Sequence, residues 1–239
     1  MVMRLHVRFS ASFAAFAALA LCAGTCAQAP STAAPTAGNG TYIVVDPLNN
    51  VRYDNRFDAS LGAAYGHIMA GPTLDQGANL GGLDLTGSYW FSKHFAVEGT
   101  GRSYIGSSGA GNTGGPLDIK GPFVAEYLFA AGPEWLGPHN KHGALIAHVL
   151  VGGAHFNSHL QGMPASDVDF YPNQVAPAAI FGGHFDLNRS SRWVFRVTPD
   201  ALFTRYSFNY ATVPATTSPR SNWNFGLSVG VEYKFKKKR

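Results

Sequence analysis

The chain has 239 residues, of which 46% are hydrophobic and only 13% are charged. Because a typical soluble domain carries roughly 25% charged residues, this composition argues against an ordinary well-solvated globule, and also against disorder and coiled coils. The only two cysteines, Cys22 and Cys26, lie near the N-terminus, which excludes disulfide scaffolds, Cys-ligated zinc sites and thiol catalysis in the remainder.

The net charge of +4 arises at the two ends of the chain. Arg4 and Arg8 account for two of the 18 Lys and Arg, and residues 236–239 account for four, which leaves 12 against 14 Asp and Glu in between. The body therefore lacks a general basic surface. We expect no nucleic-acid partner.

Residues 1–27 have the features of a secretory signal peptide. After a short basic segment, residues 13–23 form an apolar stretch that is too short to cross a bilayer as a helix. Cleavage after Ala27 or after Ala29 fits the small residues that follow. A lipoprotein anchor is the alternative, but neither cysteine follows the small residue that such a signal needs.

Residues 28–55 are expected to form a linker and an N-terminal extension. Up to residue 40 they are rich in Ala, Pro, Thr and Gly without periodicity, which is typical of a flexible linker. Residues 41–55 include a short apolar run and leave two alternatives, pairing with a strand or capping the mouth of the following domain. That domain is expected over residues 56–235, with residues 236–239 as a basic tail.

Period-two alternation of apolar and polar residues dominates the domain. In the last segment Trp223, Val229 and Phe235 lie on one face and Glu232 lies on the other. Eight such segments are each long enough for the roughly 9–11 residues of a tilted transmembrane strand. Their expected bounds are 57–69, 83–91, 95–104, 118–130, 144–154, 175–187, 193–203 and 223–235. No run of 18 apolar residues follows the leader, so no transmembrane helix is expected.

Three observations favour a membrane barrel over a soluble lipocalin-like binder. The last strand carries aromatic residues at both ends of its apolar face, as at two membrane interfaces, and the polar faces hold most of the charge. The connectors also alternate in length, as in outer-membrane barrels. The second, fourth and sixth are compact (92–94, 132–142 and 188–191), whereas the others are long or rich in glycine (71–80, 106–116, 156–174 and 207–220).

Three prolines lie within the expected strands. Pro122, Pro177 and Pro199 each remove a donor from the hydrogen-bond ladder, and a closed barrel has no edge strand to hold them. We expect β-bulges to accommodate them.

These features together resemble the small OmpA-type outer-membrane β-barrels of Gram-negative bacteria. The resemblance covers about residues 56–235 and is carried by the signal peptide, the eight amphipathic strands, the tight turn Trp90-Phe91-Ser92-Lys93-His94-Phe95 and the terminal Val229-Gly230-Val231-Glu232-Tyr233-Lys234-Phe235. It implies an all-β fold, an eight-stranded antiparallel up-and-down transmembrane barrel in the outer membrane. It also implies that Phe235, with Tyr233, is the assembly signal for the barrel-assembly machinery. The chain departs from the family by its basic tail after Phe235.

Polar side chains on the inward faces are expected to form a network in the barrel interior. Its members are Asp84, Glu98, Arg102, Lys120, Glu126, His148, His184, Asp186, Arg196, Asp200 and Glu232. The interior of an eight-stranded barrel is just wide enough to be filled by its own side chains, so these groups should pair in a plugged lumen. The alternative is a narrow, low-conductance pore in which the two arginines exchange partners among Asp84, Glu98, Glu126 and Glu232.

No metal site, cofactor or catalytic centre is expected. The pairs His139/His142 and His155/His159 lie in a turn and at the start of a loop, without a cysteine or a carboxylate at fixed spacing. Some eight-stranded barrels are lipid-modifying enzymes that use a His with a Ser and an acid, but Ser158 and His159 are adjacent and would face opposite sides of a strand. Such an enzyme remains an alternative.

The expected function is therefore non-enzymatic. We expect a monomer embedded in outer-membrane lipid, with an envelope-structural role or a surface interaction through its external loops. The loop 156–174 contains several aromatic residues and is the best candidate for an external ligand, of which the sequence gives no identity. The alternative is that these aromatics fold over the rim of the barrel.

Overall fold

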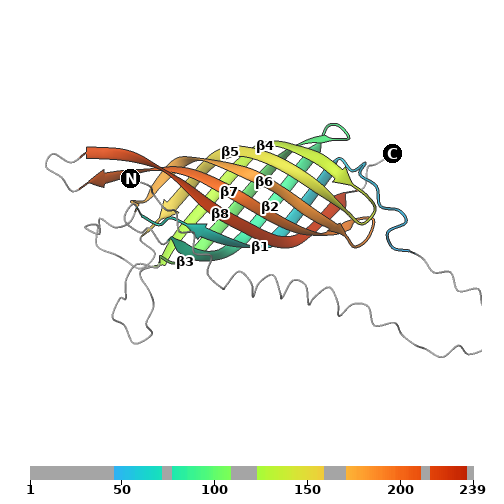
Figure 1. Ribbon diagram of the computed structural model, residues 1–239, viewed down its shortest axis with the longest axis horizontal. Helices are drawn as coiled ribbons and strands as arrows, with labels where there is room; N and C mark the ends of the chain where they lie inside the picture. The colour runs from blue at the N-terminus through green and yellow to red at the C-terminus, as the bar shows by residue number, and fades with distance from the viewer. Residues whose placement is uncertain (1–45, 72–76, 109–122, 159–170, 211–215, 236–239) are drawn as a thin grey trace, which may run out of the picture. The chain divides into compact units, whose positions relative to one another are not determined.

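The computed structural model describes residues 46–71, 77–108, 123–158, 171–210 and 216–235. In this part of the chain eight antiparallel strands close into an up-and-down barrel in which the first strand pairs with the last (Figure 1). The strands are β1 (Phe57–Ile68), β2 (Ala78–Trp90), β3 (Phe95–Ser107), β4 (Phe123–His139), β5 (Gly143–Asn157), β6 (Gln174–Asn188), β7 (Trp193–Tyr210) and β8 (Thr216–Phe235). The predicted fold class is confirmed. The expected leader, most of the linker, and the basic tail lie outside the described residues.

Among the described residues, no helix is both long enough and apolar enough to cross a membrane.

Side chains alternate between the lumen and the outer surface along every strand. On β3, Glu98 and Arg102 are buried in the lumen, whereas Val97 and Ile105 face outward. The outer face is apolar, and Leu85 and Phe129 expose 60% and 65% of their surface. A barrel with charged side chains inside and apolar side chains outside is the reverse of a soluble barrel. It is the arrangement that a membrane-spanning barrel requires.

Exposed aromatic side chains form a girdle at the end of the barrel that carries the short turns. Trp193 and Phe235 each contact Tyr233, with ring centroids 4.9 and 5.0 Å apart, and Phe57 contacts Tyr89 at 4.9 Å. Ten residues back along β8, Trp223 contacts Phe181 and Phe203 on the outer face. At about 3.3 Å per residue and a tilt near 40°, the two aromatic levels lie about 25 Å apart, the height of the apolar band of outer-membrane barrels.

The three short turns are stabilised in the same way. In each, a polar side chain accepts hydrogen bonds from two backbone amides, which fixes the turn locally. Ser92 accepts from His94 and Phe95, Asn140 from His142 and Gly143, and Ser190 from Arg192 and Trp193.

The fourth strand is one of the places where the expected bounds are wrong. Residues 132–142 were predicted as a connector because glycine and proline interrupt them, but β4 continues to His139. Pro133 pairs with Val97 of β3, and the ladder to β5 omits the pairs of Gly132 and Pro133 but resumes at Glu134. The register shifts between Leu136 and His139, next to Pro138. One missing donor therefore interrupts a ladder without ending the strand.

The other prolines also differ from expectation. The pairing of β5 with β6 continues through Pro177, and the register between β6 and β7 is the same on both sides of Pro199. The bulges predicted at these two residues are absent there. Pro122 lies outside the described residues.

The last hairpin is longer than predicted. Residues 207–220 were expected to be a connector, but pairing of β7 with β8 continues to Tyr210 and Thr216, so that only residues 211–215 separate the strands. Figure 1 shows this hairpin reaching beyond the other strands at the end with the long connectors. Arg205 and Ser221, which pair just above the Trp223 level, are exposed polar residues. The hairpin therefore leaves the apolar band at this level.

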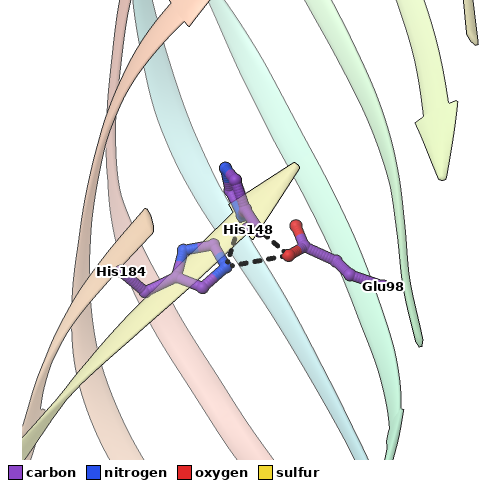
Figure 2. Close-up of side chains that lie close together, drawn as sticks. All are labelled: Glu98, His148 and His184. Carbon is purple, nitrogen blue, oxygen red and sulfur yellow. Dashed lines mark hydrogen bonds and ion pairs between the residues drawn. The ribbon is translucent and has the colours of Figure 1, made fainter. Parts of the chain in front are cut away.

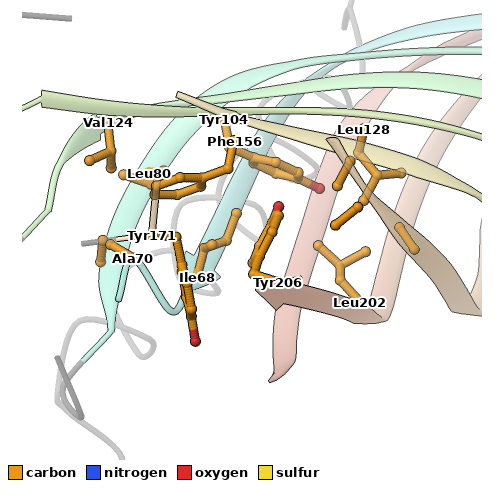
Figure 3. Close-up of a cluster of buried hydrophobic side chains, with 14 of the residues drawn as sticks. Ile68, Ala70, Leu80, Tyr104, Val124, Leu128, Phe156, Tyr171, Leu202 and Tyr206 are labelled. Carbon is orange, nitrogen blue, oxygen red and sulfur yellow. The ribbon is translucent and has the colours of Figure 1, made fainter. Parts of the chain in front are cut away.

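An apolar cluster fills the half of the lumen nearest the long connectors (Figure 3). Leu128, Leu150 and Leu202 come from different strands and are completely buried. Tyr206 and Phe156 pack with ring centroids 5.5 Å apart, and both contact Tyr171, which lies just before β6. The Tyr171 amide bonds the carbonyl of Ala70, so this residue ties the segments after β1 and before β6 across the mouth.

Candidate functional site

The other half of the lumen holds the polar network. Ten of the eleven residues expected in the barrel interior are inward-facing and at most 5% exposed: Asp84, Glu98, Arg102, Glu126, His148, His184, Asp186, Arg196, Asp200 and Glu232. Lys120, the remaining one, lies outside the described residues. Their common direction follows from the two-residue period of a strand, because all ten occupy positions of the same parity.

Arg102 organises the middle of the lumen. It forms ion pairs with Asp84, at 3.3 Å, and with Asp200, and all three side chains are at most 6% exposed. The Asp84 carboxylate also accepts hydrogen bonds from three hydroxyl groups, those of Thr86 at 3.0 Å, Thr100 at 3.1 Å and Ser228 at 2.6 Å. The Arg102 guanidinium therefore joins β3 to β2 and β7, and Asp84 extends these contacts to Ser228 of β8.

Two histidines and a glutamate meet beside this group (Figure 2). Glu98 Oε2 lies 2.8 Å from His148 Nδ1 and 3.2 Å from His184 Nε2, and these two nitrogens lie 3.3 Å apart. The outer nitrogen of each ring has its own partner. His148 Nε2 lies 2.8 Å from Asp200, and His184 Nδ1 lies 2.8 Å from Thr198.

A second arginine organises the end with the short turns. Arg196 makes a bidentate pair with Asp186, its cross-strand partner, at 2.7 and 2.9 Å. It also forms an ion pair with Glu232 of β8. Nearby, Asp58 accepts a 2.5 Å hydrogen bond from the Trp90 indole.

The two arginines do not share the partners that the pore hypothesis gave them. Arg102 pairs with Asp84 and Asp200, whereas Glu98 contacts the histidines. Glu126 lies in the apolar half of the lumen beside Tyr206, away from both arginines. The ion pairs of the described lumen therefore form two separate groups.

Three charged lumen residues were not among those expected in the network. Asp58, Glu134 and Lys234 are at most 6% exposed on inward faces. Glu134 was missed because the fourth strand was predicted to end at residue 130, before it. Asp58 and Lys234 share the parity of the other inward residues, so strict alternation would have found them.

Acidic groups outnumber basic ones in the described lumen. Eight carboxyl groups are buried there: Asp58, Asp84, Glu98, Glu126, Glu134, Asp186, Asp200 and Glu232. The buried cationic side chains are Arg102, Arg196 and Lys234, apart from the two histidines. Burying unbalanced carboxylates is costly, so this interior favours additional positive charge.

Residues 46–56 cap the mouth at the end with the short turns. The Tyr53 hydroxyl donates to the Asn140 carbonyl at 3.1 Å and accepts from Asn188 at 2.7 Å, and Lys234 lies 4.2 Å from the Tyr53 ring. Burial raises the pKa of Tyr53, which keeps its hydroxyl neutral and able to donate. Of the two alternatives for the N-terminal extension, the described part therefore fits the cap.

The other histidines and the expected assembly signal lie outside this network. His139 and His142 are exposed near the turn after β4, and His155 stacks on Tyr127. His159 lies outside the described residues, as does most of the loop 156–174. Tyr233 and Phe235 face outward in the aromatic girdle, where Phe235 is exposed.

Comparison with known proteins shows the fold. No protein-family model matches the sequence, and no curated protein matches it. Among solved structures, the outer membrane protein OprG from Pseudomonas aeruginosa is similar with a TM-score of 0.52 and 13% identity, over 79% of this chain and 99% of that one. Neisserial surface protein A matches with a TM-score of 0.46 and 12% identity, over 75% of this chain and 97% of that one. The attachment invasion locus protein Ail of Yersinia pestis matches with a TM-score of 0.43 and 15% identity, over 76% and 99%.

The fold is thus that of small outer-membrane β-barrels, and the expected outer-membrane location agrees with it. At these identities the likeness concerns the fold and not the activity.

Proposed function

We propose that this chain is an OmpA-type barrel that spans the outer membrane of a Gram-negative bacterium as a closed, non-conducting plug. Its role would be envelope-structural or a surface interaction, carried out without catalysis and as a monomer. The observation that carries the proposal is the filled lumen. Apolar side chains fill one half of it and charged and polar side chains the other, and Tyr53 and Tyr171 lie at its two mouths.

The two ends of the barrel support a surface role. The turns 91–94, 140–142 and 189–192 are compact and join strands at one end, whereas the other end carries the long connectors and the projecting β7–β8 hairpin. Outer-membrane barrels place long loops outside the cell and short turns in the periplasm. In this orientation Phe235 lies at the periplasmic end, where the barrel-assembly machinery would read it with Tyr233.

The closed lumen predicts an electrically silent protein. Planar-bilayer recording of the purified chain should show no reproducible conductance steps, because no water column crosses the apolar cluster. Replacing Phe156 and Tyr206 together with alanine should open the cluster and produce steps. The outward Phe129→Ala variant is the matched control and should stay silent. Steps in the unmodified protein that Arg102→Ala abolishes would contradict the plug and support the pore.

A further inference from the structure

We propose that Glu98, His148 and His184 form a binding site for one divalent transition-metal ion, with zinc as the best fit, which cross-links β3, β5 and β6 inside the lumen. This inference goes beyond the plug proposed above. It also differs from what the sequence predicts, which is no metal site and a place for His148 and His184 in the polar interior.

The three ligand atoms have the spacing of a metal site. Glu98 Oε2, His148 Nδ1 and His184 Nε2 lie 2.8, 3.2 and 3.3 Å from one another. Tetrahedral zinc with bonds of about 2.0–2.2 Å holds its ligand atoms about 3.3–3.6 Å apart. Two imidazoles and a carboxylate are a common ligand set for zinc and for other divalent transition metals. Small adjustments of these side chains would therefore accommodate an ion.

Asp200 orients the His148 ligand toward the other two through its second ring nitrogen. Asp200 accepts only, so the 2.8 Å contact with His148 Nε2 places a proton on that nitrogen. In the neutral ring, Nδ1 then presents a lone pair to the Glu98 carboxylate 2.8 Å away. Two acceptors in this position repel each other unless a proton or a metal cation lies between them. Histidine ligands of metals are commonly oriented in this way by a carboxylate on the other ring nitrogen.

The backbone leaves room for this support. Gly182 lies opposite His148 on β6, and a Cβ atom there would come within 1.9 Å of the Asp200 carboxylate. A larger residue would push Asp200 away from the ring that it orients. His184 is supported separately, by the hydroxyl of Thr198 at 2.8 Å from Nδ1.

Charge and burial favour an ion at the same place. The described lumen holds eight buried carboxyl groups against three Arg and Lys side chains, and a divalent cation reduces this excess. Glu98 is completely buried, and its Oε1 atom has no hydrogen-bond partner among the described residues. That oxygen is available as a further ligand. Because all three ligands are buried, we assign the ion a structural role.

Metal content tests the site directly. The full chain, purified in detergent from the outer-membrane fraction and also refolded from urea with zinc, is passed through a desalting column and analysed by mass spectrometry of the metals. We expect a single zinc ion per chain that survives desalting. His184→Gln and Glu98→Gln should lose it, whereas His142→Gln, in an exposed turn, should retain it. Heat-modifiable migration on a gel verifies that each variant is folded.

X-ray absorption of the zinc-loaded, unmodified protein keeps the proposal testable if a variant does not fold. A first shell of two imidazoles and carboxylate oxygen supports the site. A shell of oxygen only, metal that desalting removes, or equal retention by the His184→Gln variant overturns it. In those cases protons, not a metal, would balance the histidine–glutamate cluster.

Discussion

Replacing Arg196 with methionine is expected to lower the free energy of unfolding by about 3–5 kcal/mol. Methionine roughly preserves the length of the side chain but leaves the buried carboxylates of Asp186 and Glu232 without their shared partner. The loss comes chiefly from that uncompensated charge, since the intact pair itself barely offsets its desolvation. Urea titration of the protein in lipid vesicles, followed by tryptophan fluorescence, measures the change.

Two further variants separate charge from packing. Adding Asp186→Asn and Glu232→Gln to the Arg196→Met protein should recover part of the loss, because both uncompensated charges are removed. Lys141→Met breaks an exposed pair with Asp46 and should change stability far less than Arg196→Met does. A loss below about 1 kcal/mol in Arg196→Met would show that the lumen is hydrated and that this ion pair is not structural.

An arginine on the outer face should be nearly as harmful. Leu85 is 60% exposed at a position about 10 Å from the Tyr89 level, near the middle of the apolar band. Leu85→Arg is therefore expected to destabilise the barrel in a bilayer by about 2–4 kcal/mol. Reversible urea unfolding from lipid vesicles gives this value. Phe91→Arg adds the same charge at the membrane interface and should cost about 0–1 kcal/mol.

In a soluble protein the outcome would differ. A new charge at an exposed leucine would face water and would leave stability unchanged or improve it. Equal, small effects of Leu85→Arg and Phe91→Arg would therefore contradict the membrane orientation.

Alternation predicted the barrel well because a strand has only two faces. Once Glu98 and Arg102 are assigned to the same face, every second residue follows, and the structure buries both. Glycine and proline misled the prediction at β4, where a strand paired on both sides tolerates a missing donor at Pro133. The β7–β8 ladder also continued through residues whose polarity indicated a loop.

The partners within the lumen could not be predicted from parity. The tilt and shear of the barrel decide which inward residues meet. Neither can be inferred from the alternation of polar and apolar residues along one strand. Glu98 and His148 belong to strands that are not neighbours in the sheet, yet they touch across β4. His148 and His184 were expected in the polar interior, but their convergence with Glu98 on one point is visible only in three dimensions.

The membrane orientation is tested most directly by measuring what surrounds the outer face of the barrel. With Cys22 and Cys26 replaced by alanine, the chain has no other cysteine, so a nitroxide spin label can be attached at single new cysteines. In vesicles, labels at Leu85→Cys and Val151→Cys should be relaxed by oxygen, which dissolves in hydrocarbon, and shielded from a water-soluble nickel chelate. A label at Lys93→Cys, in the turn after β2, should show the opposite pattern. Access of the nickel chelate to Leu85→Cys and Val151→Cys would mean that the apolar face does not contact lipid.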